Sequence, residues 1–233
     1  MPRIFDNIEL PLLPALQDTL PLSQKSDFCV GYFNLRGWRL IDKYLDHFTG
    51  GDGNVCRVLI GMQRLSQDDM HILYSIVEGE PASQGQSEVF KKKMAEDFRE
   101  QLAAGAPTNE DEQGLRRLAV QIRNKKVVVK LYFRHTLHAK LYLLYRTDPN
   151  NPIVGFLGSS NLTLSGLSKQ GELNVDVLDH DACRKLEKWF NDRWDDRFCV
   201  DISEMLASII ENSWARETLI VSSSLGYAEG YAP

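Results

Sequence analysis

The sequence lacks the features of a secreted, membrane-spanning or zinc-binding protein. Its 233 residues include four cysteines, none in a CxxC pair: Cys29, Cys56, Cys183 and Cys199. Cys29 and Cys56 fall within apolar segments, so we expect buried thiols rather than disulfides or zinc ligands. No apolar run approaches the roughly 20 residues of a membrane helix, and the first residues lack a basic segment followed by an apolar one. We therefore expect a cytoplasmic protein that does not bind membranes.

Two other absences limit the possible chemistry. No group of carboxylates has the pattern of a two-metal site, so no metal and no cofactor is expected. No internal repeat is present. With 43% hydrophobic and 25% charged residues, the chain can bury a full core as one large domain or two small ones.

Acidic residues are missing from one stretch of an otherwise acidic chain. Residues 121–146 carry +7, which leaves −12 for the remainder of a chain whose net charge is −5. The basic residues are Arg123, Lys125, Lys126, Lys130, Arg134, Lys140 and Arg146. Such a run can be a solvated face or a local binding surface for phosphates. The run brackets the sequence His138-Ala139-Lys140, and this position favours a binding surface for phosphates.

Residues 134–146, RHTLHAKLYLLYR, contain two histidines and a lysine in what resembles a buried strand. Side chains alternate along a strand, so His138 and Lys140 are predicted to share one face and His135 to lie on the other. An imidazole beside an ammonium group stabilises a core poorly, but it can bind an anion. The pair therefore predicts an anion site.

The first half of the chain has an alternating pattern. Apolar segments at 26–33 and 55–62 predict two strands, and the amphipathic segment 35–48 predicts a helix between them. This arrangement is typical of a parallel βαβ unit. Residues 66–124 are charged and predicted to be helical, with interruptions at 79–86 and 104–114.

The second half begins with strands and ends with helices. The predicted strands are 126–133, 138–145, 152–158 and 172–179. The polar residues 146–151 predict a hairpin turn. Helices are expected at 181–196 and 203–215, before a Gly-, Ser- and Tyr-rich end that resembles a linker.

A small polar loop follows the strand at 152–158. Gly158 permits close backbone approach, Ser159 and Ser160 offer hydroxyls, and the amide of Asn161 can donate to an oxyanion. Glu172, eleven residues after Asn161, could accept a hydrogen bond from a histidine. Taken alone, His138 could be a structural histidine, residues 158–161 could be a turn, and Glu172 could be a solvated carboxylate. Their combination and order favour a phosphate-binding site.

The set His138-x-Lys140, Gly158-Ser159-x-Asn161 and Glu172 resembles the signature of the phospholipase D superfamily. It is most similar to the single-motif nuclease branch, which includes modules placed before helicase domains in bacterial restriction and defence proteins. The chain differs in having Tyr145 five positions after the lysine, where the family often has Asp. The hairpin at 146–151 also lengthens the interval to Gly158.

The resemblance extends from about Ser26 to about Trp194. It implies a phospholipase D-like α/β sandwich with a mixed, largely parallel central sheet flanked by helices. The implied organisation is an N-terminal extension at 1–25, the nuclease domain at 26–200, and a C-terminal helix with a linker-like tail at 201–233.

The resemblance also assigns roles to the residues. His138 would attack phosphorus to give a phosphohistidine, while Lys140 and Asn161 neutralise the phosphate oxygens. Glu172 would accept from the other ring nitrogen of His138 and hold its tautomer. The remaining predicted substrate contacts are Gly158, Ser159, Ser160, Lys130 and Arg134.

The leaving oxygen needs a proton, and the family supplies it from a second HxK motif. None of the other histidines begins such a motif: His47, His71, His135 and His180 are followed two positions on by Thr49, Leu73, Leu137 and Ala182. A homodimer would bring two copies of His138 to one cleft. His135 is a rival acid, but the opposite strand face disfavours it unless a bulge intervenes.

The sequence therefore predicts a metal-independent phosphodiesterase. The favoured activity is a DNA endonuclease, with RNA as an alternative substrate, in a module of a restriction- or helicase-type protein followed by a helicase domain. One alternative is a catalytically weak DNA-binding and dimerisation module of the same fold. Another is a phosphodiesterase that acts on a phospholipid or small molecule, although no amphipathic membrane-binding stretch is evident.

Overall fold

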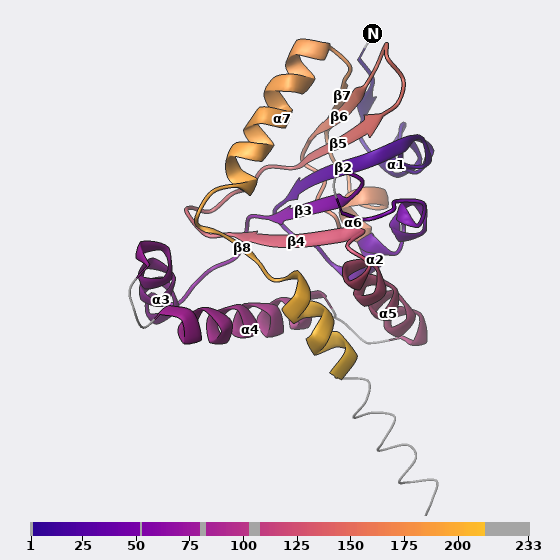
Figure 1. Cartoon of the computed structure of the whole chain (residues 1–233). Helices are drawn as coiled ribbons and strands as arrows, with labels where there is room; N and C mark the ends of the chain where they lie inside the picture. The colour runs from indigo at the N-terminus through magenta and orange to yellow at the C-terminus, as the bar shows by residue number, and fades with distance from the viewer. Residues whose placement is uncertain (1, 52, 80–82, 103–107, 213–233) are drawn as a thin grey trace, which may run out of the picture.

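The computed structural model describes residues 2–51, 53–79, 83–102 and 108–212. These residues form one eight-stranded sheet with helices on both faces (Figure 1), in the strand order β1-β7-β6-β5-β2-β3-β4-β8. The strands are β1 Ile4–Phe5, β2 Ser23–Val30, β3 Cys56–Ile60, β4 Val127–Tyr132, β5 Leu141–Arg146, β6 Ile153–Gly158, β7 Asn174–Val177 and β8 Cys199–Asp201. The predicted α/β class is confirmed.

The helices are α1 Leu12–Thr19, η1 Leu20–Leu22, α2 Leu35–Trp38, η2 Asp42–Leu45, α3 Gln67–Glu78, α4 Ser83–Leu102, α5 Asn109–Arg123, α6 Leu164–Ser168 and α7 His180–Trp194. Residues 203–212 are also helical. Local signals fix several ends: the side chain of Ser66 caps α3, and a capping box formed by Thr108 and Asp111 begins α5. The predicted linker-like tail lies outside the described residues.

The sheet is mixed, but it is less parallel than predicted. The β2–β3 and β3–β4 pairs are parallel, and the other five of the seven pairings are antiparallel. The predicted parallel βαβ unit is therefore correct, and the predicted hairpin at 146–151 joins antiparallel β5 and β6. The prediction of a largely parallel sheet is only partly correct. The apolar run in β5 reflects burial on both faces of the sheet, and antiparallel strands can be buried on both faces as well.

Alternating side chains divide the core between the two faces of the sheet. Tyr142 and Leu144 of β5 pack with α1, α2 and α5, whereas Leu141 and Leu143 pack beneath α7. The aromatic residues that α7 contributes to this second cluster include Phe190, which is fully buried. Burial on both faces explains the apolar strands of the sequence.

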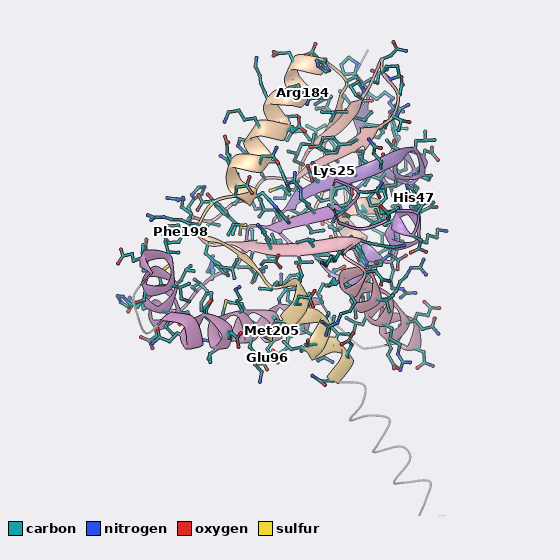
Figure 2. The ribbon with its side chains drawn as sticks, in the orientation of Figure 1. Lys25, His47, Glu96, Arg184, Phe198 and Met205 are labelled. Atoms are coloured by element: carbon teal, nitrogen blue, oxygen red, sulfur yellow. The ribbon has the colours of Figure 1, made fainter. Side chains whose placement is uncertain are left out.

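The segment predicted as one helix at 35–48 is broken into α2 and η2. A methyl group on Gly37 would lie 2.6 Å from the backbone of Leu162 and Thr163, so α2 packs closely on the chain that leads into α6. His47, labelled in Figure 2, follows η2. Its Nε2 lies 2.7 Å from the carbonyl oxygen of Ser23. This contact gives His47 a structural role.

The N-terminal residues belong to the same core. β1 pairs with β7, and Leu12 and Leu16 of α1 are fully buried. None of the helices within the described ranges is long and apolar enough to cross a membrane.

Candidate active site

The HxK residues lie immediately before β5, a central strand, at the end of the sheet where the parallel strands β2 and β3 finish. Residues 134–140 are not in a strand, so the prediction that His138 and Lys140 lie within a strand is wrong. The amide of Leu137 donates to the carbonyl of Gly61 at 2.9 Å, which leads this segment across the end of β3. The antiparallel β2–β5 pair then places the HxK residues beside the carboxyl ends of the parallel strands.

His138 and Lys140 are in direct contact. Nζ of Lys140 lies 2.7 Å from Nε2 of His138 and donates to its carbonyl oxygen at 3.0 Å. His138 is exposed, whereas Lys140 is 3% exposed. Burial lowers the pKa of Lys140, and the negative charge of Glu172 opposes this shift. A protonated Lys140 would donate to an unprotonated Nε2, which leaves the ring proton on Nδ1.

Asn161 is oriented by the end of β2. Its Oδ1 accepts hydrogen bonds from the amides of Gly31 at 3.1 Å and Tyr32 at 3.0 Å. These two bonds occupy the carbonyl side of the amide and leave Nδ2 as a donor. Asn161 is therefore oriented so that Nδ2 takes no part in these two hydrogen bonds and can donate to another group, such as a phosphate oxygen.

Gly31 joins the two halves of the site. A methyl group on Gly31 would lie 3.1 Å from Oδ1 of Asn161, 3.5 Å from Cδ2 of His138 and 2.9 Å from Cγ of Met62. Sequence reasoning placed this glycine inside a strand and missed its role. A glycine directly after an apolar strand was the available signal, because close backbone approach favours glycine there.

Hydrogen bonds from β5 and β7 hold the loop that carries Asn161. Asn174 donates through Nδ2 to Oγ of Ser160 at 2.8 Å and accepts the Ser160 amide at 3.2 Å, and Tyr142 donates to the Ser160 carbonyl at 2.9 Å. Ser160 is fully buried, so it supports the loop from inside. A methyl group on Gly158 would lie 2.2 Å from the carbonyl oxygen of Leu173, which shows how closely the loop packs.

Glu172 lies beside the loop but does not bond to the imidazole. The hydroxyl of Ser159 donates to the Glu172 carboxylate and accepts the amide of Leu173 at 2.9 Å. Within the described part of the chain, Lys140 is the hydrogen-bond partner of the His138 ring, so the expected bond from His138 to Glu172 is not formed. The influence of Glu172 on the pKa of Lys140 nevertheless places its charge near the site.

The two remaining predicted substrate contacts are engaged near the C-terminal end of α7. Lys130 donates to the carbonyl of Trp194 at 3.1 Å, and Arg134 binds both carboxylate oxygens of Asp196. The structure does not bring these two side chains into contact with the His138 cluster. His135 is exposed, and its ring lies edge-on to Tyr132 at 5.2 Å.

The basic segment of the sequence does not form one continuous surface. Lys125 and Lys126 precede β4 and Arg146 ends β5, so these residues lie at the opposite end of the strands from the HxK residues. Arg123 pairs with Glu204 and Glu211.

No group of three or more His, Cys, Asp and Glu side chains is arranged to hold a metal ion in the described ranges. The site consists of an imidazole, a buried ammonium group, an amide donor and hydroxyl groups at one end of the central strands. These groups can bind and attack a phosphodiester.

Comparison with known proteins identifies a family and several distant folds. Residues 23–194 match the family model described as Cardiolipin synthase, PLD-like domain. No curated protein matches the chain. Solved structures that resemble it include Nuc, a phospholipase D family member of Salmonella typhimurium, with 10% identity over 86% of this chain and 97% of Nuc at a TM-score of 0.49. NucT of Helicobacter pylori has 13% identity over 86% of this chain and 98% of NucT at 0.45. Phosphatidylserine synthase of Haemophilus influenzae has 16% identity over 96% of this chain and 46% of the synthase at 0.49.

Proposed function

Because the chain belongs to the phospholipase D-like family, we propose that it is a metal-independent phosphodiesterase that cleaves DNA. The observation that carries this proposal is the 2.7 Å contact between Nε2 of exposed His138 and Nζ of buried Lys140. The contact supports the proposal because a nucleophilic imidazole would then act beside an ammonium group that can bind the phosphate.

Phosphate binding is the first step of the proposed mechanism. A phosphodiester resists attack because its oxygens are negatively charged, so its non-bridging oxygens need cations and donors. Lys140 supplies the cation, Nδ2 of Asn161 supplies a donor, and the rigid loop at 158–161 holds that donor in place. The phosphate oxygen then replaces His138 as a partner of Lys140.

Nucleophilic attack follows. Nε2 of His138 forms a bond to phosphorus while the bond from phosphorus to the leaving oxygen breaks, and an acid protonates that oxygen. The group that protonated the leaving oxygen then takes a proton from water as water attacks phosphorus, the P–N bond breaks, and the imidazole of His138 leaves and is regenerated. Glu172 would accept from Nδ1 of His138 during these steps, which requires its carboxylate to exchange the Ser159 hydroxyl for the ring.

The acid comes from a second copy of the chain in this proposal. His138 of the partner subunit protonates the leaving oxygen, so the functional unit is a homodimer. The chain would act as a module of a restriction- or helicase-type protein. Sequence preference would come from other elements, because His138, Lys140 and Asn161 would contact the phosphate and not the bases.

Cleavage in excess EDTA tests this proposal. Wild type should cut single- or double-stranded DNA without added metal, and His138→Ala should abolish cutting while DNA binding is retained. His135→Ala is a matched control, because His135 is also exposed and lies only three residues away. Cleavage that returns only with Mg²⁺ or Mn²⁺ would refute the phosphohistidine mechanism. DNA binding without any cleavage would favour the binding-module alternative.

A further inference from the structure

Tyr32 is an exposed aromatic residue that directly follows Gly31, and it is 42% exposed. Among the Phe, Tyr and Trp residues that the structure describes, Tyr32 is the one whose ring contacts neither another ring nor a cation. Its hydroxyl group also has no hydrogen-bond partner among the described residues. Single exposed aromatic residues are common on protein surfaces, so the position of Tyr32 decides whether it has a function.

A short parallel bridge places Tyr32 beside Asn161. The bridge joins Phe33 to Leu162, and the amide of Asn34 donates to the Leu162 carbonyl at 3.1 Å. The side chains of Phe33 and Leu162 are both buried in the core. Side chains alternate along paired extended segments, so the preceding residues, Tyr32 and Asn161, both face away from that core. The 3.0 Å hydrogen bond from the Tyr32 amide to Oδ1 of Asn161 agrees with this placement.

The imidazole of His138 lies close to the same residues. A methyl group on Gly31 would be 3.1 Å from Oδ1 of Asn161 and 3.5 Å from Cδ2 of His138, so both side chains approach the residue that precedes Tyr32. A phosphate bound between His138 and Asn161 would therefore lie next to Tyr32. The base of an adjoining nucleotide would then be within reach of the Tyr32 ring.

Neighbouring contacts hold the backbone on both sides of Tyr32. The ring of Phe33 packs edge-on against Trp38 at 5.4 Å and lies 5.8 Å from the ring of Phe98. On the other side, the amide of Met62 donates to the carbonyl of Gly31 at 3.3 Å. A residue on a fixed backbone loses little conformational freedom when a ligand covers its side chain. The Tyr32 ring is therefore well prepared to stack on a ligand.

Arg64 adds a positive charge at the same end of the sheet. It follows Met62 by two residues, in the segment that continues β3 past its hydrogen bond to Gly31. Arg64 is exposed, and its side chain forms no hydrogen bond or ion pair with any described residue. Exposed aromatic rings combined with cations that follow the phosphate backbone are typical of proteins that bind single-stranded nucleic acids.

We propose that Tyr32 stacks on an unpaired base beside the phosphate bound at His138, so that the substrate is single-stranded DNA. This inference rests on the proposed function and adds a strand preference to it. A base within a duplex is covered on both faces by its neighbours, whereas an unpaired base can turn one face to a ring. Every base has such a face, so Tyr32 selects unpaired strands without selecting a sequence. A lipid surface is a less suitable partner for Tyr32, because the chain has a net charge of −5 and would be repelled by anionic lipids.

Fluorescence anisotropy in excess EDTA tests this inference with three labelled ligands: an oligothymidine, the same strand without bases, and a covalently closed duplex. All proteins carry His138→Ala, so that binding is measured without cleavage. Tyr32→Ala should raise the Kd for the oligothymidine by about 5- to 100-fold, the loss expected for one stacked base. The Kd values for the strand without bases and for the closed duplex should stay within about twofold, because neither ligand offers an unpaired base.

Three further variants separate stacking from other effects. Tyr32→Phe keeps the ring and should retain the affinity for oligothymidine, whereas Tyr32→Leu keeps apolar bulk without a ring and should lose it. Tyr74→Ala on α3 is the matched control, since Tyr74 is 49% exposed and its ring packs against Phe198, and its Kd values should match those of the parent protein. Circular dichroism and urea unfolding check that each variant is folded.

Cleavage by proteins that retain His138 distinguishes this inference from the proposed function. Loss of oligothymidine binding in Tyr32→Ala, with no cleavage by wild type, would support base stacking and refute the nuclease function. Cleavage by wild type, with equal binding and cutting of oligothymidine by Tyr32→Ala, would overturn base stacking alone. Equal losses on all three ligands would overturn it as well, because the ring would then act on the backbone. Binding of wild type to vesicles of phosphatidylcholine and phosphatidylglycerol but not to oligothymidine, with loss of vesicle binding in Tyr32→Ala, would overturn it in favour of a lipid surface.

Discussion

The phenol hydroxyl of Tyr145 donates a hydrogen bond to the carboxylate of Asp27 at 2.6 Å, across the pair formed by β2 and β5. Asp27 is fully buried and also binds the guanidinium of Arg57 through both of its oxygens. The resemblance noted above places an Asp where this chain has Tyr145. A neighbouring strand thus supplies a carboxylate that Tyr145 contacts.

The first prediction concerns this buried cluster. Asp27→Ala should lower the free energy of unfolding by about 3–5 kcal/mol, because it leaves the largely buried guanidinium of Arg57 without its carboxylate partner. Tyr145→Phe removes one hydrogen bond and should cost about 1–2 kcal/mol. Asp18→Ala, at an exposed position, should change stability by less than about 0.5 kcal/mol. Urea denaturation measures all three, and equal effects of Asp27→Ala and Asp18→Ala would contradict a stabilising cluster.

A second prediction follows from the titration of Tyr145. Burial, and then the negative charge of Asp27, raise the pKa of Tyr145 above its ordinary value of 10.0. Above pH 10.0 the unfolded chain loses the phenol proton while the folded chain keeps it, so the contribution of Tyr145 to stability falls with increasing pH. The difference in unfolding free energy between wild type and Tyr145→Phe should be constant below that value and should shrink above it. Urea titrations across this range would show the trend, and a constant difference would argue against it.

Local patterns in the sequence were sufficient to predict that His138 and Lys140 lie side by side. His138 and Lys140 are two residues apart, so they are neighbours in any extended backbone, and they remain in contact although the strand begins only at Leu141. Apolar runs, which reflect burial on both faces of the sheet, similarly predicted the strands. The relative direction of distant strands is set by the connections between them, and the apolar pattern does not record it.

Contacts between distant segments were not predictable from spacing. Gly31 meets Asn161 across 130 residues of sequence, and Tyr145 meets Asp27 across 118. The basic segment shows the same limitation. Its charges are continuous along the chain, but β4 and β5 carry them to opposite ends of the sheet, so they do not form one surface. The predicted hydrogen bond between His138 and Glu172 depends on the path of the loop, which spacing does not give. In the structure the hydroxyl of Ser159 donates to the Glu172 carboxylate instead.

The third prediction separates the two sides of the Asn161 amide. Asn161→Asp keeps an oxygen that can accept from the amides of Gly31 and Tyr32, but it replaces the Nδ2 donor with a negatively charged oxygen. Turnover should fall by about 100- to 1,000-fold, as when one transition-state donor is lost, while unfolding free energy changes little. Asn161→Ala should lose both the activity and some stability. If Asn161→Asp cleaves as well as wild type, Asn161 only holds the loop.

The fourth prediction contrasts stability with activity at Lys140. Burial lowers the pKa of Lys140 from 10.5, so the folded state disfavours its charge at neutral pH. Lys140→Met should therefore keep or raise the free energy of unfolding at neutral pH, to within about 1 kcal/mol, while weakening both DNA binding and cleavage. Any gain in stability should decrease as pH rises toward 10.5, because the folded wild type then releases its proton before the unfolded chain does. A large loss of stability at neutral pH would show that Lys140 is a structural residue.

The last prediction tests whether each active site takes His138 from two subunits. In a mixed dimer of wild type and His138→Ala, one histidine is present where the mechanism needs two, so the mixed dimer should be inactive. Only pairs of wild-type subunits are then competent, and activity after complete exchange should follow the square of the wild-type fraction. A site that is complete in each protomer would give a straight line instead. Total protein is held constant while the mixing ratio varies, and differently tagged chains confirm exchange. A linear result, or an active monomer, would place the acid within one chain, and His135, which is exposed and three residues from His138, would be the first to test.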